Sequence, residues 1–283
     1  MASSFTLLYD LIRWEEKAIV EAAKKRGVRV NLVDARELAL EATGRGSEIP
    51  DHLILERCVS HYRNIHATAT LESLGHRVVN SFQTAYISSD KLFGSLALAR
   101  AGIPTPRTFV AFTEEAALKS LEKLGYPAVL KPVVGSWGRL SALLKDSDFA
   151  TAILEDREYM YPMYQVYYLQ EFVKRPPRDI RSFVVGDRTI AAIYRLSSSD
   201  WRTNTARGGK AEMCPITKEL DELSLRSARA VGGEIVGVDL MESPDGLTVH
   251  EVNNTTEFKN TVPATGVDIP GLIVDYLASL EKR

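Results

Sequence analysis

Residues 236–253 read VGVDLMESPDGLTVHEVN, and this stretch decides how the rest of the chain is interpreted. Two apolar runs flank Asp245-Gly246, a dipeptide typical of tight turns, so they predict two antiparallel strands joined by a hairpin. Asp239 lies inside the first run, where a charged carboxylate is costly to bury unless it is paired or bound to a metal. Glu251 and Asn253 are two residues apart on the second strand, so their side chains share one face.

The hairpin is expected to bring these oxygen donors together. Carboxylate and amide oxygens are the ligands that magnesium takes when it holds nucleotide phosphates. We therefore predict a metal site formed by Asp239, Glu251 and Asn253. The alternative is a salt-bridged edge strand with surface acids, which the apolar flanks disfavour because carboxylates are seldom buried among apolar residues.

The composition limits the class of protein. At 283 residues the chain is long for one domain and sufficient for two or three small ones. A net charge of −2 favours neither nucleic acid nor a membrane surface as a partner. No apolar run approaches the length of a membrane span and no signal-peptide pattern opens the chain, so we expect a cytoplasmic protein. Cys58 and Cys214 are isolated, which favours buried thiols over a zinc site.

The first part of the chain alternates strands and helices. A helix is predicted at 14–25, and strands are predicted at 5–9, 28–33, 52–55 and 77–79. This alternation favours a small parallel sheet covered by helices, which we assign to residues 1–90. A dinucleotide-binding fold is disfavoured because no G-x-G-x-x-G follows the first strand.

Residues 91–165 predict a separate small α+β unit. Helices at 90–101 and 113–124 precede a strand at 128–131, and a second strand at 141–144 returns after the loop Gly135-Ser-Trp-Gly-Arg139. Backbone N–H groups of a glycine-rich loop can hold phosphate oxygens, and Lys131 beside it supplies a positive charge. The loop lacks the GK[ST] ending of a P-loop. A plain tight hairpin is an equal alternative for this segment.

Residues 166–283 predict a hairpin-rich antiparallel sheet. One helix is predicted at 220–231, and strands are predicted at 168–173, 179–185, 189–194, 236–240 and 247–252. Arginines recur at strand ends and in the polar loop that contains Arg207. Clustered arginines of this kind suit the recognition of carboxylates or phosphates.

Read in order, these residues resemble the ATP-grasp fold and, more narrowly, the LysX/ArgX enzymes, which are relatives of RimK-type glutamate ligases. The resemblance extends over nearly the whole chain, and the narrower match is carried by residues 55–60, 131–140, 204–209, 251–260 and 265–270. The resemblance implies an α/β (α+β) ATP-grasp fold. Its parts are an N-terminal parallel-sheet (pre-ATP-grasp) domain, a central lid domain and a C-terminal antiparallel domain with the metal and substrate site.

The resemblance also implies roles for individual residues. Nucleotide binding falls to Lys91, Lys131, Gly135, Ser136, Trp137, Gly138, Arg139, Leu140, Gln170, Glu171, Phe172, Val173, Asp179, Arg181, Arg195 and Asn204. Catalytic roles fall to Arg195, Asn204 and Arg207. The amino-acid substrate would meet Thr205, Ala206, Asn260, Thr261, Val262, Pro263, Ala264, Thr265 and Gly266. The loop of residues 135–140 would close over the nucleotide.

The reaction implied by the resemblance is an ATP-dependent ligation that uses ATP and Mg²⁺, with two ions expected. ATP phosphorylates a carboxylate, and an amine then attacks the acyl phosphate. In this family the carboxylate is the side chain of the C-terminal glutamate of the acidic carrier protein LysW. The amine is the α-amino group of 2-aminoadipate in lysine biosynthesis, or of glutamate in arginine biosynthesis. We favour aminoadipate, because its branch resembles this chain at Asn260-Thr261. The family also suggests a homo-oligomer.

Two rival interpretations remain. A RimK-like ligase that adds glutamate to another protein would share every ATP-binding and metal-binding residue. A non-catalytic nucleotide-binding module is disfavoured by the intact set of Asp239, Glu251 and Asn253, because such a module needs no metal ligands.

Overall fold

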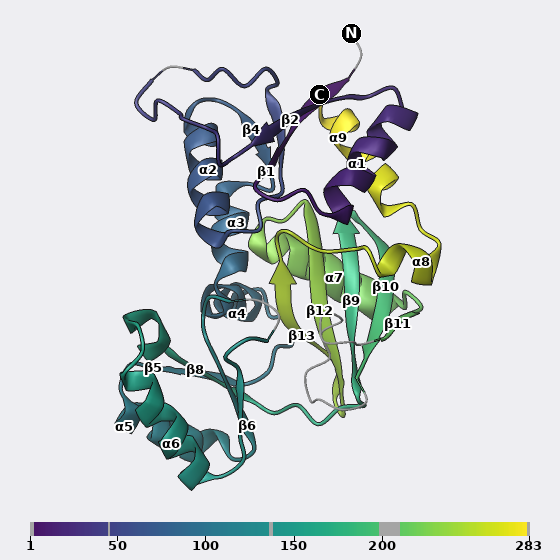
Figure 1. The fold of residues 1–283 in the computed structure, drawn as a ribbon. Helices are drawn as coiled ribbons and strands as arrows, with labels where there is room; N and C mark the ends of the chain where they lie inside the picture. The colour runs from purple at the N-terminus through teal and green to yellow at the C-terminus, as the bar shows by residue number, and fades with distance from the viewer. Residues whose placement is uncertain (1–2, 45, 136–137, 198–209, 282–283) are drawn as a thin grey trace.

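The computed structural model describes residues 3–44, 46–135, 138–197 and 210–281, and its three sheets are arranged as Figure 1 shows. The first sheet is parallel, in the order β2-β1-β3-β4. Its elements in chain order are β1 (Ser4–Tyr9), α1 (Trp14–Lys25), β2 (Arg29–Asp34), β3 (Leu53–Glu56), α2 (His61–Ser73) and β4 (Arg77–Val79). The predicted parallel sheet is confirmed.

The second sheet forms a small unit at the lower left of Figure 1 and is antiparallel, in the order β5-β8-β6-β7. Two helices lead to it, α3 (Phe82–Ser89) and α4 (Lys91–Arg100). Its own elements are β5 (Thr108–Ala111), α5 (Glu114–Leu124), β6 (Ala128–Lys131), β7 (Ala142–Leu144), α6 (Ser147–Glu158), η1 (Pro162–Gln165) and β8 (Tyr167–Glu171).

The third sheet is also antiparallel, in the order β11-β10-β9-β12-β13. Its strands are β9 (Arg178–Val185), β10 (Arg188–Leu196), β11 (Lys210–Met213), β12 (Ile235–Ser243) and β13 (Gly246–Asn253). The helices of this part are α7 (Lys218–Val231), α8 (Thr261–Thr265) and α9 (Ile269–Leu280). The predicted antiparallel arrangement is confirmed, and the whole is a mixed α/β architecture.

Several predicted helix boundaries have side-chain caps. The Asp90 carboxylate accepts hydrogen bonds from the backbone N–H groups of Leu92 and Phe93, and the Thr113 hydroxyl accepts one from Ala116. Such caps satisfy N–H groups that a helix start leaves without partners. Gly232 ends α7 with a φ of +72°, a conformation that glycine adopts without steric cost.

One predicted strand is too long. The sequence suggested 168–173, but β8 ends at Glu171. Glu171 pairs with Ala128, the first residue of β6, so the chain beyond Glu171 has no neighbour to bond on that side. Phe172 and Val173 therefore follow the strand instead of belonging to it.

The first hydrophobic core joins distant parts of the chain. It combines apolar side chains of residues 5–79 with others from residues 183–277, including Phe183, Ile273 and Leu277. Figure 1 shows why: α9, in yellow, returns to lie beside α1, in purple. A second core fills the space between the third sheet and α7, and a third lies under α5 and α6.

Other features agree with the sequence. Cys58 and Cys214 are both buried free thiols, as predicted. Among the described residues, no helix is long and apolar enough to cross a membrane.

Candidate functional site

Alternation along β12 aims Asp239 away from α7. Val236, Val238 and Leu240 pack into the core beneath α7, so Gly237 and Asp239 face the opposite side of the sheet. Asp239 is buried, with 4% of its surface exposed, so it is not a surface acid. A side chain at position 237 would come within 2.4 Å of the Thr256 hydroxyl, which accounts for the glycine there.

Side chains from the three antiparallel strands β9, β10 and β12 form a row of ion pairs on this face. Asp239 pairs in register with Arg181, and Asp179 pairs with Arg195. Arg181 donates to both carboxylate oxygens of Asp239, at 2.6 and 2.7 Å. Arg195 donates to both oxygens of Asp179, at 2.7 and 2.8 Å, and its Nη2 lies 3.1 Å from Asp239 Oδ2. The four side chains therefore alternate in charge as Asp179, Arg195, Asp239 and Arg181.

These four charged side chains stabilise one another. Burial opposes ionisation of Asp239, but the guanidinium groups of Arg181 and Arg195 outweigh it and hold the pKa of Asp239 well below its usual range. Burial also opposes the charge of Arg195, whose pKa is nevertheless raised by Asp239 and Asp179. Both groups are thus ionised at neutral pH.

The predicted metal ligands meet at the same place. Glu251 lies directly across from Asp239 in the ladder, and Asn253 lies across from Gly237. The Asn253 amide nitrogen is 3.4 Å from Asp239 Oδ2. The Glu251 side chain forms no hydrogen bond or ion pair with any described residue, although its charge acts on Lys131. β13 is indeed an edge strand, as the alternative interpretation required, but Glu251 is not salt-bridged within the described chain.

A β-bulge changes the direction of the neighbouring histidine. The register of β12 and β13 shifts between Asp239 and Leu240, which leaves His250 as an extra residue on β13. The His250 ring nitrogens lie 3.2 and 3.4 Å from Lys131 Nζ. Bulges commonly redirect side chains next to functional sites. The bulge therefore brings His250 of the third sheet into contact with Lys131 on β6 of the second sheet.

Lys131 is a buried cation without an ion pair in the described chain. Its ammonium donates to Gln170 Oε1 at 2.6 Å. Burial, in spite of the opposing effect of Glu251, lowers the pKa of Lys131 to about 7. Burial and the Lys131 charge also lower the pKa of His250 well below its usual value, so the imidazole is neutral. A ligand with negative charge would favour the protonated lysine.

The second predicted lysine lies at the glycine loop. Lys91 begins α4; its Nζ donates to the Gly135 carbonyl at 2.6 Å, and its backbone N–H donates to Val133 at 2.8 Å. Gly135 and Gly138 both have positive φ, and Leu140, with a φ of +56°, is exposed. Arg139 is also exposed on this segment.

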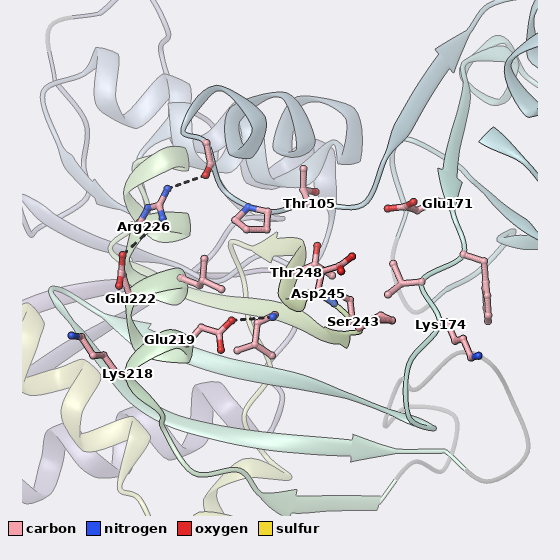
Figure 2. A pocket seen from close by; sticks show the side chains of 17 residues that line it. Thr105, Glu171, Lys174, Lys218, Glu219, Glu222, Arg226, Ser243, Asp245 and Thr248 are labelled. Atoms are coloured by element: carbon pink, nitrogen blue, oxygen red, sulfur yellow. Dashed lines mark hydrogen bonds and ion pairs between the residues drawn. The ribbon is translucent and has the colours of Figure 1, made fainter. Parts of the chain in front are cut away.

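The end of β8 and the residues that follow it line a different pocket. Glu171, Phe172 and Val173 contribute to a cavity of about 890 Å³ beside the start of α7. Figure 2 shows Glu171 and Lys174 at one end of it and Glu219 and Glu222 at the other. The structure thus separates these residues from Gln170, whose side chain is buried against Lys131.

Six predicted residues lie outside the described part of the chain. They are Ser136, Trp137, Asn204, Thr205, Ala206 and Arg207.

The predicted substrate segment divides into two. Asn260 and Thr261 line a pocket of about 260 Å³, next to Arg181 and Arg195. Val262 and Ala264 pack against the first core instead. Pro263 and Gly266 are exposed, and Thr265 donates to the Thr261 carbonyl.

Sequence reasoning missed His250 and the charged residues around the smaller pocket, Arg13, Glu15, Glu257 and Lys259. The sequence does contain a signal for the bulge. Leu247 and Val249 alternate with period two, which would place the next apolar residue at position 251, but the next one is Val252. No comparable signal marks Arg13, because its contact with the C-terminal segment depends on the tertiary fold.

The described residues contain no group of three or more His, Cys, Asp or Glu side chains that could hold a metal. The predicted set combines the carboxylates of Asp239 and Glu251 with the amide of Asn253, so it is not a group of that kind.

Comparisons with known proteins agree with the geometry. Residues 88–277 match the model of a RimK-like ATP-grasp domain, and residues 5–87 match that of a LysX preATP-grasp domain. The alpha-aminoadipate–LysW ligase LysX of Saccharolobus solfataricus is 40% identical over 273 residues, which cover 96% of this chain and 99% of that protein. The glutamate–LysW ligase ArgX of Sulfolobus acidocaldarius is 34% identical over 277 residues, 96% of each chain.

Among solved structures, the RimK domain ATP-grasp protein of Sphaerobacter thermophilus matches with a TM-score of 0.77 at 29% identity, covering 97% of this chain and 99% of that one. The family confirms a fold that binds ATP and the class of carboxylate–amine ligase. This chain belongs to the ATP-grasp ligases of the LysX/ArgX type.

Proposed function

We propose that this enzyme joins the α-amino group of 2-aminoadipate to the side-chain carboxylate of the C-terminal glutamate of the carrier protein LysW, in lysine biosynthesis. The observation that carries the proposal is the 40% identity to a LysX enzyme over nearly the whole of both chains. The greater identity to LysX than to ArgX, 40% against 34%, and the Asn260-Thr261 pair favour aminoadipate over glutamate.

The nucleotide phosphates are proposed to lie between Lys131, Lys91 and the charged face of the third sheet. Lys131 is a desolvated cation whose only hydrogen-bond partners in the described chain are the neutral Gln170 and His250. An anionic phosphate would supply the missing countercharge, and charge-assisted bonds of this kind are about twice as strong as neutral ones. Lys91 would reach the same oxygens from the glycine loop, and Arg195 would act from the sheet.

Magnesium fits the donors on this face. Asp239 is ionised, and the Glu251 side chain makes no hydrogen bond or ion pair in the described chain. The Asn253 amide directs its nitrogen to Asp239, which leaves its oxygen for a cation. Hard oxygen ligands from one or two carboxylates, completed by phosphate oxygens and water, are what this ion takes. When bound, the metal neutralises charge on the phosphate oxygens; two ions are part of the proposal.

The chemistry requires positioning more than covalent participation by the protein. A carboxylate oxygen of the carrier attacks the γ-phosphorus and ADP leaves, which gives an acyl phosphate. The neutral amine then forms the C–N bond, phosphate departs with the electron pair of the broken C–O bond, and the nitrogen gives up one proton. The fixed charges of Arg181 and Arg195 are already oriented by Asp239 and Asp179, so no reorganisation is needed as negative charge develops.

The proposal also includes the acidic carrier as partner and a homo-oligomeric enzyme. The direct test is to incubate the enzyme with ATP, magnesium, LysW and 2-aminoadipate, and to measure the mass of the carrier. We expect a gain of one aminoadipate residue with equimolar ADP release. A carrier of unchanged mass, or a gain of glutamate in preference when both amino acids compete, would refute the assignment.

A further inference from the structure

The three residues that follow the proposed metal ligand Asn253 are bonded by side chains of the N-terminal part of the chain. β13 ends at Asn253, and Figure 1 shows its arrow pointing toward the parallel sheet. Arg57 and Asn80 directly follow β3 and β4, and Asn64 lies on α2. These three side chains meet residues 254–256 at the carboxyl edge of the parallel sheet.

Asn80 uses its whole amide in this contact. The oxygen accepts the backbone N–H groups of Glu234 and Ile235 at 2.8 and 2.9 Å. The nitrogen donates to the carbonyls of Ile235 and Asn254 at 2.7 and 3.2 Å. A side-chain amide has two donors and one acceptor oxygen, so every group of Asn80 is paired. The side chain is buried, where a lost partner is costly to the groups left behind.

The Asn80 amide takes the place of a strand. Gly237 lies across from Asn253 in the ladder of β12 and β13, so Ile235 would lie across from residue 255 if β13 continued. Instead, the N–H and the carbonyl of Ile235 are both bonded by Asn80. The amide therefore replaces the next peptide group of the strand, and β13 leaves the sheet directly after Asn253.

Asn64 and Arg57 hold the residues that follow. Asn64 donates to the Thr255 hydroxyl at 3.2 Å and accepts from the side-chain nitrogen of Asn254 at 3.3 Å. Arg57 donates to the Thr256 carbonyl at 3.1 Å. Asn64 and Arg57 are both buried, so water competes little for these bonds. The segment after β13 is thus fixed at each of its three residues.

We propose that Asn80 is a positioning residue for the metal site, which ends β13 at Asn253 and so holds the Asn253 amide where its oxygen can bind magnesium. The inference rests on the proposed function, because it takes the magnesium site as given and adds a residue that bonds to the backbone beside a ligand. Asn253 needs such support: among the described residues its side chain makes one hydrogen bond, of 3.4 Å, to Asp239. Partners behind the ligands commonly orient them and tune the affinity for the metal.

The test uses Mn²⁺, which takes the same kind of oxygen ligands as Mg²⁺ and gives an electron paramagnetic resonance signal when free in solution. With a non-hydrolysable ATP analogue present, Asn80→Ala should raise the Kd for Mn²⁺ about 10–100-fold, as the loss of a partner behind a metal ligand typically does. The Kd of the analogue without metal should not change, because none of the Asn80 hydrogen bonds in the described chain goes to a proposed nucleotide ligand.

Thr84→Val is the matched control. The Thr84 hydroxyl is buried on α3 and donates to the carbonyl of Gly232, which ends α7, at 2.6 Å. This bond also joins the N-terminal part to the third sheet and its helix, but it does not reach residues 254–256. Both variants should unfold at a lower denaturant concentration than wild type, and only the Asn80 variant should bind Mn²⁺ more weakly.

Asn80→Asp tests the same contact if the alanine variant does not fold. Aspartate keeps the oxygen that accepts from Glu234 and Ile235, and it removes the donors to the Ile235 and Asn254 carbonyls. An added negative charge alone would strengthen Mn²⁺ binding, so weaker binding reports the lost position of the backbone. Mn²⁺ affinity equal to or greater than that of wild type would contradict the positioning role.

Glu251→Ala separates this inference from the proposed function. If wild type binds no Mn²⁺ with the analogue, or if E251A binds it as tightly as wild type, the proposed metal site is wrong. If wild type binds Mn²⁺ and E251A does not, but the Asn80 variant keeps wild-type affinity or T84V weakens it equally, the positioning role alone is wrong.

Discussion

Replacing Lys131 by methionine should make the ligand-free enzyme more stable at neutral pH while it weakens ATP binding. The ammonium is buried, with 7% of its surface exposed, and burial lowers its pKa from 10.5 to about 7. Each pH unit between these values corresponds to about 1.4 kcal/mol, so the protonated lysine costs the folded state about 4–5 kcal/mol below pH 7. Loss of the bond to Gln170 offsets about 1–3 kcal/mol of the gain from removing this charge.

The pH dependence is the sharper part of this prediction. Between pH 7 and 10.5 the unfolded wild type binds more protons than the folded state, so wild-type stability rises with pH through this window. The methionine variant lacks this contribution, and its advantage over wild type should shrink by about 3 kcal/mol between pH 7 and pH 10. Urea unfolding followed by circular dichroism measures the difference, and calorimetry measures ATP affinity. Lys119→Met, an exposed helix position paired with Glu115, is the control and should be insensitive to pH. A difference between K131M and wild type that does not change with pH would refute the account of a desolvated charge.

Three further changes test other parts of the site. Glu251→Ala should lower carrier-dependent ADP release at least about 100-fold without loss of fold, since the side chain has no described partner; near-normal turnover would remove it from the metal site. Asp239→Asn should destabilise the protein by about 3–5 kcal/mol, because it leaves the buried Arg195 and the partly buried Arg181 undercompensated, as a denaturant midpoint would show. The double variant Asn260→Gly with Thr261→Phe should shift the aminoadipate-to-glutamate ratio of kcat/KM toward glutamate, by about 10–200-fold at most. An unchanged ratio would mean that this pair does not set the preference.

Most of the fold could be predicted because local signals and tertiary structure agree. The helix predicted at 14–25 and the strand at 77–79 have the observed bounds, and the Asp90 and Thr113 caps begin helices where their sequence pattern indicates. The helices that escaped prediction include α3, α6, α8 and α9. The place of α9 depends on the apolar surface of α1 and β9, which no local pattern reveals.

The candidate site was predictable as a list of residues and not as a set of contacts. Strand periodicity indicated that Asp239 and Glu251 would be close, and the ladder pairs them. It could not indicate that Arg181 and Arg195 would both reach Asp239, because that depends on the register of three separate strands. His250 shows the same limit at finer scale, since one extra residue in β13 redirects a whole side chain.

The return of α9 to α1 bears on how the protein is made. Residues 26–268 separate the two helices, and at about 5–20 residues per second a ribosome needs roughly 12–50 s to synthesise them. During this interval the nascent N-terminal sheet lacks Ile273, Val274 and Leu277, which belong to its core. Exposed apolar surface of this kind invites aggregation or chaperone binding. The N-terminal sheet is thus the first part to be translated and among the last to complete its packing.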